Sequence, residues 1–194
     1  MRCAYLSLAF GLILLGDAFA QAYKPPKFDK PAFDVKKVGL MEVERQKFAT
    51  NLAGYVANEV KVAENSHKAE WARKLIGLAL HLDRRNRVAL VANHQFNRGL
   101  APKKVAMDYK TEPLAKLLIA KSKAIAAVGG QENLYLAGLF LATAVEMDPG
   151  NEDAVYQMEL YKIDVGQIDW EPITDGKPRK PLKDPKPDGI ARDK

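Results

Sequence analysis

The sequence predicts an all-α protein, and a duplicated motif is the strongest of the observations that predict it. Residues 71–90 read WARKLIGLALHLDRRNRVAL, and residues 136–155, 65 positions later, read LAGLFLATAVEMDPGNEDAV. Five positions are identical: Ala72/Ala137, Ala79/Ala144, Asp83/Asp148, Asn86/Asn151 and Ala89/Ala154. Each copy describes a helix, a tight turn and the start of a second helix, because apolar residues recur at spacings of three and four around the turn. Nowhere does the apolar and polar alternation of a strand persist beyond a few residues.

The first two predicted helices cover residues 40–63 and 67–82. An apolar stripe at helical spacing runs along the first helix and contains Phe48, Leu52, Val56 and Val60. Asn65 can cap the second helix, because its short side chain accepts a hydrogen bond from an amide of the first turn. The second helix has two adjacent apolar stripes, which predict that it is covered from two sides.

The third predicted helix runs from about residue 87 to residue 98, and Asn86 can cap it. Residues 99–110 then interrupt the helical pattern with Gly99, Pro102 and mixed polarity. We expect a loop there.

Three further helices are predicted in the second half of the chain. Thr111-Glu112-Pro113 is a favourable helix start, and the fourth helix runs from there to about residue 128. The fifth helix, residues 132–147, is almost entirely apolar but too short to span a bilayer, which predicts a buried core helix. The sixth helix, residues 152–165, follows a polar turn and ends at Gly166.

The two ends of the chain have a different composition from the middle. Residues 21–39 are rich in proline and lysine and predict an extended linker before a helical domain over residues 40–166. Residues 167–194 repeat this proline- and lysine-rich character, and we expect a disordered tail.

Residues 1–20 have the three parts of a secretory signal peptide: a positive start, an apolar run over residues 4–16, and small residues before the cleavage site. The run is shorter than the roughly 20 apolar residues of a membrane span. We therefore expect export to the periplasm or the extracellular space, cleavage after Ala20 or Ala22, and no membrane span in the mature chain. The alternative is anchoring by an uncleaved signal. Cys3 is the only cysteine, so the mature chain would have no disulfide.

Charge is unevenly distributed along the chain, whose net charge is +6. Residues 51–128 contain 14 Lys and Arg against 6 Asp and Glu, a net charge of +8. Residues 131–170 contain one Lys against eight acidic residues, a net charge of −7. Solvated helix faces explain this pattern. The alternative is a dipolar surface that steers partners or lets copies of the chain pack head to tail.

The second copy of the motif resembles the tetratricopeptide repeat. That family has small residues seven positions apart in its second helix and an Asp-Pro-x-x-Asn turn, which correspond here to Ala137, Ala144, Asp148, Pro149 and Asn151. The first copy has arginine at the proline position. An offset of 65 is close to two repeat units of about 34 residues. The resemblance covers residues 70–165 and implies a short α-solenoid of about six antiparallel helices.

The resemblance also implies a partner-binding surface. The family lines a concave groove with positions two, five, nine and twelve of each first helix. The positions in this chain that match are Val88, Val91, Gln95 and Arg98, followed by Asp153, Tyr156 and Leu160. The resemblance implies that these residues contact a peptide or a partner protein.

No motif of the sequence indicates catalysis or a bound cofactor. His67, His81 and His94 lack the spacing of metal ligands, and no P-loop, GxGxxG or GxSxG motif occurs. A basic cluster lacks the aromatic neighbours and the docking helix of nucleic-acid binding; it comprises Arg84, Arg85, Arg87, Lys103 and Lys104. We therefore expect no metal, no cofactor and no nucleic-acid partner.

Together these observations predict an exported, non-catalytic scaffold or adaptor that binds a protein or peptide and can also associate with itself through its basic and acidic faces. Two alternatives remain open. The chain could be an accessory subunit that docks into a larger envelope assembly through its sixth helix. It could also be a small enzyme or binding protein whose site assembles from residues far apart in the sequence.

Overall fold

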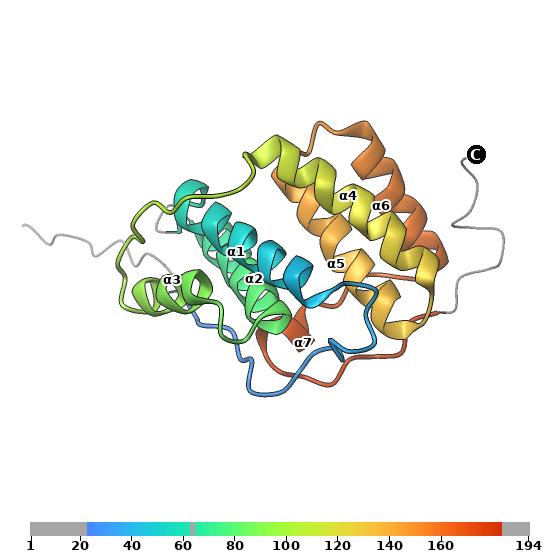
Figure 1. Cartoon of the computed structure of the whole chain (residues 1–194), viewed down its shortest axis with the longest axis horizontal. Coiled ribbons are helices and arrows are strands. Elements are labelled where there is room, and N and C mark those ends of the chain that lie inside the picture. Colours follow the sequence, from blue (N-terminus) through green and yellow to red (C-terminus); the bar gives the residue numbers. More distant parts are fainter. Residues whose placement is uncertain (1–22, 63–64, 184–194) are drawn as a thin grey trace, which may run out of the picture.

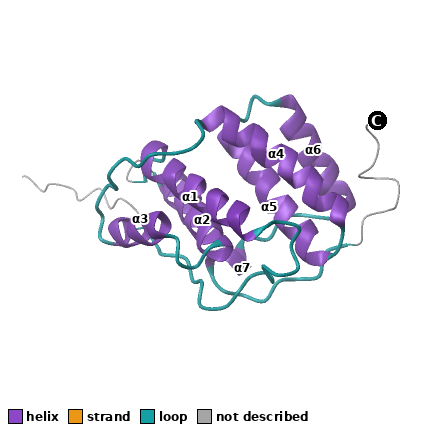
Figure 2. Ribbon diagram, in the orientation of Figure 1, coloured by secondary structure: helices purple, strands orange, loops and turns teal. Residues whose placement is uncertain are grey.

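The computed structural model describes residues 23–62 and 65–183, and these residues form seven α-helices and no strand (Figures 1 and 2). The helices are α1 (Glu42–Glu59), α2 (Ser66–Leu82), α3 (Arg87–Asn97), α4 (Thr111–Val128), α5 (Gln131–Met147), α6 (Glu152–Asp164) and α7 (Glu171–Thr174). The predicted all-α fold is confirmed. None of the described helices is long and apolar enough to cross a bilayer. The predicted signal peptide, residues 1–20, and both predicted cleavage sites lie outside the described residues.

The duplicated motif corresponds to two matching helix–turn–helix segments. α5 begins and ends 65 positions after α2, and α6 begins 65 positions after α3. The side-chain oxygen of Asn86 accepts a hydrogen bond from the Ala89 amide at 3.1 Å, and that of Asn151 accepts one from the Ala154 amide at 3.0 Å. The two turns therefore use the same N-cap, which satisfies an otherwise unpaired amide of the first helical turn.

Each motif belongs to a unit of three helices. In the first unit, α1 packs against α2 and α3; in the second unit, α4 packs against α5, which also packs against α6. The alanines common to both motifs are buried at these contacts, where small side chains let neighbouring helices approach closely: Ala72, Ala79, Ala89, Ala137, Ala144 and Ala154.

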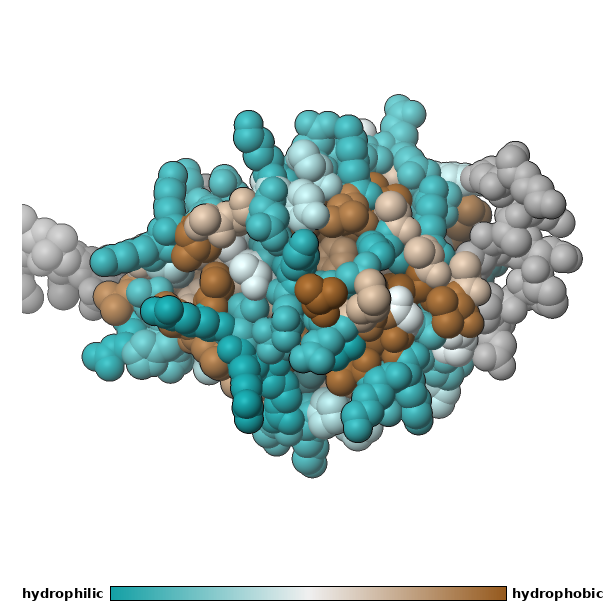
Figure 3. Space-filling model, in the orientation of Figure 1, coloured by the Kyte–Doolittle hydropathy of each residue, from teal (hydrophilic) through white to brown (hydrophobic). Residues whose placement is uncertain are grey.

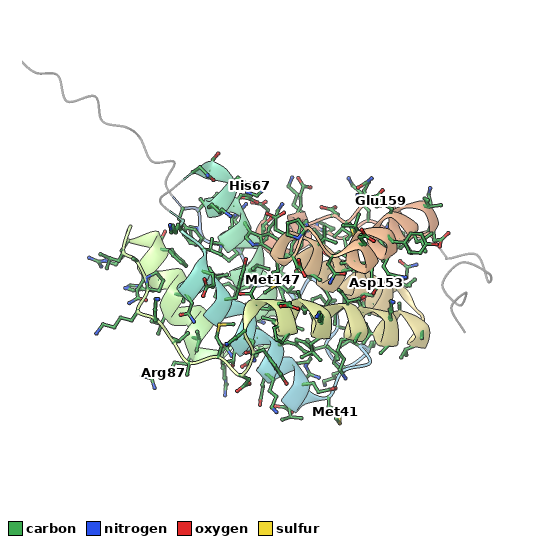
Figure 4. All side chains as sticks on the ribbon, turned by 90° about the horizontal axis from the view of Figure 1, so that it is seen from above. Met41, His67, Arg87, Met147, Asp153 and Glu159 are labelled. Atoms are coloured by element: carbon green, nitrogen blue, oxygen red, sulfur yellow. The ribbon has the colours of Figure 1, made fainter. Side chains whose placement is uncertain are left out.

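The two units meet through their first and second helices. The rings of Phe48 on α1 and Phe140 on α5 lie 4.9 Å apart, and Glu44 on α1 forms an ion pair with Lys121 on α4. α3 and α6 are left on opposite flanks of the molecule, as two perpendicular views agree (Figures 1 and 4). This arrangement differs from a continuous solenoid, in which α3 would stack directly on α4.

Residues 23–41 form an N-terminal strap across both units. Tyr23 is buried and its hydroxyl donates a hydrogen bond to the side-chain oxygen of Asn93 on α3 at 2.9 Å. Phe33 is also buried, and its ring lies 6.4 Å from that of Tyr135 on α5. The segment predicted as a linker is therefore part of the folded domain.

Residues 165–183 form a C-terminal strap that includes α7. Ile173 is fully buried against α2, where a side chain on Gly77 would come within 2.9 Å of the Ile173 carbonyl oxygen. Arg73 on α2 donates to Asp175 at 2.6 Å. The prediction of a disordered tail is therefore wrong for residues 167–183, because their apolar and charged side chains find partners on helices that are distant in the sequence.

The expected loop over residues 99–110 contains no helix and lies against α1. The side-chain amide of Asn58 pairs with both the N–H and the carbonyl of Val105, each at 2.9 Å. Two turns earlier on α1, Asn51 accepts from the Asp108 amide at 3.0 Å. These side chains replace the backbone partners that an extended segment lacks.

Candidate partner-binding faces

The solvent face of α3 carries apolar side chains that no other element of the described chain covers. Its exposed positions at helical spacing include Arg87, Leu90, Val91 and His94, and exposed Arg98 follows directly after the helix. Leu90 is 39% exposed and Val91 is 48% exposed. We call this set the α3 face.

The solvent face of α6 has the same construction. Its exposed positions at helical spacing include Glu152, Val155, Tyr156, Glu159 and Ile163. Val155 is 38%, Tyr156 58% and Ile163 73% exposed. We call this set the α6 face.

The two faces occupy equivalent positions in the two units. With the offset of 65, Leu90 corresponds to Val155 and Val91 to Tyr156, so each unit presents a pair of exposed apolar side chains at the same place on its third helix. The core side of each helix is also alike in the two units, because Ala89 and Ala154 occupy equivalent positions and are both fully buried. The motif thus repeats a solvent-facing feature as well as a packing surface.

The seven residues predicted from the family resemblance divide between these two helices and do not form one groove. Figure 4 shows Arg87 on α3 at one end of the molecule, and Asp153 and Glu159 on α6 at the other. Val91 and Arg98 of the first set, and Tyr156 of the second, are exposed on the two faces. The prediction of a single shared groove is therefore corrected to two separate surfaces.

The other predicted site residues are less available to a partner. Val88 is half-buried against the hydrophobic core, and Gln95 and Leu160 are also half-buried. Asp153 is exposed and forms an ion pair with Lys123 of α4 at 3.2 Å.

The sequence prediction missed Leu90, Val155 and Ile163 as surface residues. A signal was present, because each of these positions lies three or four residues from a charged residue on its helix: Leu90 from Arg87, Val155 from Glu152, and Ile163 from Glu159. The sequence alone did not distinguish these apolar residues from those of the core.

The surroundings of the α3 face are strongly basic. No acidic residue occurs from Arg84 to Met107. Six basic side chains in this stretch have no carboxylate within 4.0 Å among the described residues; they are Arg84, Arg85, Arg87, Arg98, Lys103 and Lys104. At this end of the molecule, Figure 3 shows apolar side chains among long hydrophilic ones.

The surroundings of the α6 face are acidic. Glu146, Asp148, Glu152, Asp153 and Glu159 follow one another without an intervening basic residue. Two neutralising contacts reach this group from lysines, one from α4 to Asp153 and one from Lys162 to Glu159 at 2.6 Å. Two acidic residues on the helix start, Glu152 and Asp153, also interact favourably with the helix dipole.

A cavity of about 680 Å³ lies between the N-terminal strap and the ends of α1, α2 and α5. Its walls carry four acidic residues (Asp34, Glu42, Asp83 and Glu132) and four basic residues (Lys36, Arg45, Arg84 and Arg85). The opposite charges balance, so the cavity has no excess charge that would select an ionic substrate.

His81 is the one histidine on the cavity wall. It is 6% exposed, and its Nδ1 accepts a hydrogen bond from the Ala32 amide at 3.2 Å. The pKa of His81 is lowered to about 4, mainly because burial disfavours the charged imidazolium; the nearby charge of Arg84 adds to the decrease, while the backbone at Ile173 and Lys27 and the charge of Asp29 oppose it. His81 is therefore neutral at pH 7, and its hydrogen bond links the N-terminal strap to α2.

Among residues 23–62 and 65–183, no group of three or more histidine, cysteine or acidic side chains is arranged to hold a metal ion. The α3 face and the α6 face are therefore the candidate functional sites that the described residues offer. In comparisons with known proteins, the chain matches no protein-family model, no curated protein and no solved structure.

Proposed function

We propose that this chain is an exported, non-catalytic scaffold that binds other proteins through the α3 face and the α6 face. The observation that carries the proposal is the pair of exposed apolar side chains that recurs at equivalent positions of both units. A single exposed apolar residue is ordinary, but a repeated pair on the solvent side of a helix, where no other described element covers it, is typical of an interaction surface.

Burial of these side chains would supply the free energy of binding. Removing apolar surface from water contributes about 25 cal/mol per Å², so the Val91 and Tyr156 side chains would each contribute roughly 1–2 kcal/mol to a complex. The charged residues around them would set orientation and partner choice rather than most of the affinity. A family resemblance to tetratricopeptide repeats supports the same role, because helical repeat proteins commonly bind peptides and proteins.

The experiment is a capture assay with the purified chain lacking residues 1–20. The immobilised chain is exposed to the exported proteins of its source cells, and bound proteins are identified by mass spectrometry. Two variants, Val91→Ser and Tyr156→Ser, each remove one exposed apolar side chain. Val43→Ser is the matched control, because Val43 is 54% exposed on α1 and belongs to neither face.

We expect a defined partner whose binding to the isolated chain weakens roughly tenfold in at least one of the two face variants, and which Val43→Ser retains. Circular dichroism confirms that each variant is folded. Equal binding to all three variants, or no partner with any of them, would contradict the proposal.

A further inference from the structure

Resting on the proposed function, we propose that one partner is a second copy of this chain, bound head to tail, with the α3 face of one copy packed on the α6 face of the next. The two faces carry equivalent apolar pairs but opposite charges. With the offset of 65, Arg87 corresponds to Glu152, and His94 corresponds to Glu159. The reversal of charge from Arg87 to Glu152, and the carboxylate of Glu159 in place of an imidazole, make the two faces complementary to each other.

An antiparallel arrangement of the two helices brings the complementary groups together. When Leu90 and Val91 of one copy lie over Tyr156 and Val155 of the next, the four apolar side chains form the centre of the contact. Arg87 then lies opposite Glu159, because each is one helical turn beyond the apolar pair. Apolar centres with charged margins are the usual anatomy of protein interfaces.

The other end of the same contact pairs hydrogen-bond donors with carboxylates. In this arrangement His94 lies opposite Glu152, and Arg98 lies over the turn before α6, where Asp148 is located. Neither Arg87 nor Arg98 has a carboxylate partner among the described residues of its own chain. Within the described part of the chain, both guanidinium groups are therefore available to pair with another molecule.

The two faces of one copy cannot meet each other, because α3 and α6 lie on opposite flanks (Figures 1 and 4). A contact between different surfaces of two copies leaves one α3 face and one α6 face unoccupied at the ends. Such heterologous contacts produce open chains or closed rings rather than two-fold dimers. A single helix-on-helix contact lies at the small end of protein interfaces, so we expect a dissociation constant of roughly micromolar or weaker.

The test is sedimentation equilibrium of the chain lacking residues 1–20, from about 10 μM to about 1 mM, in about 50 mM and about 500 mM NaCl. We expect the average mass to rise with concentration, and to rise less in the higher salt, because salt screens the charged margins. A mass that stays monomeric at every concentration, or that stops at a dimer, would overturn the proposal.

Variants with reversed charges test whether the α3 face and the α6 face form the contact between copies. Arg87→Glu and Glu159→Arg should each weaken association at least roughly tenfold by placing like charges opposite each other. The double variant Arg87→Glu/Glu159→Arg should restore association, since the pair is again complementary. Lys47→Glu is the matched control, because Lys47 is exposed on α1 and forms no ion pair among the described residues.

Association that both single variants leave intact, or that the double variant fails to restore while its circular dichroism matches that of the original chain, would place the contact elsewhere and overturn the inference. The two proposals fail separately. A chain that stays monomeric but captures a different protein through Val91 or Tyr156 would retain the scaffold function and lose self-association. A chain that associates only with itself would retain this inference and lose the wider function.

Discussion

At the scale of single residues, His81 is a buried side chain whose protonation differs between the folded and the unfolded chain within an accessible pH range. It lies on α2 beneath the N-terminal strap and is held neutral by burial, with a pKa of about 4. A neutral histidine whose Nδ1 accepts the Ala32 amide must carry its proton on Nε2. Protonation of Nδ1 would break this hydrogen bond and place a charge in the interior.

This environment makes the stability of the fold depend on pH. Because the pKa of His81 is lower in the folded state than the ordinary value of 6.5, the unfolded chain binds more protons below pH 6.5. The stability that the folded state gains from neutral His81 is present above pH 6.5 and is lost as the pH falls toward 4. Between pH 7 and pH 5 we expect the free energy of unfolding to decrease by about 2 kcal/mol from this residue.

Urea unfolding of the original chain and of His81→Gln at pH 7 and pH 5 measures this effect. His81→Gln should be less stable than the original chain at pH 7. Its free energy of unfolding should change much less between pH 7 and pH 5, because the group that titrates has been removed. His94→Gln, which changes an exposed histidine, should retain the difference. A pH dependence that is equal in all three proteins would show that His81 does not titrate as described.

At the scale of elements, the two motif turns are alike in their caps but differ in their tertiary contacts. The side-chain amide of Asn86 also donates to the hydroxyl of Thr50 on α1 at 2.9 Å, so this cap ties the turn to a neighbouring helix. The described contacts of the Asn151 side chain stay within its own turn, with Ala154 and Asp148. Asn86 is buried, and Asn151 is half-buried.

We therefore expect Asn86→Ala to destabilise the protein more than Asn151→Ala. Loss of the N-cap alone costs about 1 kcal/mol, and loss of the additional buried hydrogen bond brings the cost of Asn86→Ala to about 2 kcal/mol. Chemical unfolding of both variants at pH 7 measures the two losses of stability. Thr50→Val removes the same hydrogen bond from the other side, so adding it to Asn151→Ala should bring the total loss closer to that of Asn86→Ala. Equal losses for the two asparagine variants would mean that the contact with α1 contributes nothing.

At the scale of the whole molecule, the straps make the two units mutually dependent. Phe33 is 3% exposed and lies between the first and second units, with its ring 6.2 Å from His81 on α2 and 6.4 Å from Tyr135 on α5. The C-terminal strap also contacts both units. Tyr135 on α5 donates a hydrogen bond to the Asp169 carbonyl at 2.7 Å, and Arg73 on α2 donates one to Asp175. Neither unit buries its apolar surface alone.

We expect the molecule to unfold in one cooperative step. Tryptophan fluorescence reports on Trp71 and Trp170, whose rings lie 6.3 Å apart at the contact of α2 with the C-terminal strap, and far-ultraviolet circular dichroism reports on all helices. The two transitions in urea should coincide. Phe33→Ala should shift both together by about 3 kcal/mol, and Phe28→Ala, at a half-buried position of the same strap, should shift them less. Separate transitions would mean that the units fold independently.

The six longer helices could be predicted from the sequence because their signals are local. The spacing of Leu52 and Val56, the cap at Asn65 and the turn at Asn86 act within a few residues, and each functions in the structure as expected. The all-α fold and the pairing of two similar motifs follow from such signals alone. The proposed exported location also depends on sequence alone, since the residues that predict it lie outside the described part of the chain.

The candidate site was only partly predictable. Val91, Arg98 and Tyr156 were identified through the family resemblance, and they are exposed. Leu90 and Val155 occupy equivalent apolar positions of the duplicated motif, but a sequence shows which residues are apolar and not which of two helix faces a neighbour covers. Placement of the two faces on opposite flanks depends on how the units pack, which is not a local property.

The sequence by itself determined the helices, their caps, the duplication and the separation of basic from acidic segments, because short-range geometry and composition decide these features. Only the tertiary structure decided that residues 23–39 and 167–183 are straps and that the repeated apolar pairs face solvent. Burial of Tyr23 or Ile173 requires a partner helix that is about 70 to 100 residues away in the chain. Long-range contacts of this kind compete with chain entropy and leave no periodic pattern in the sequence.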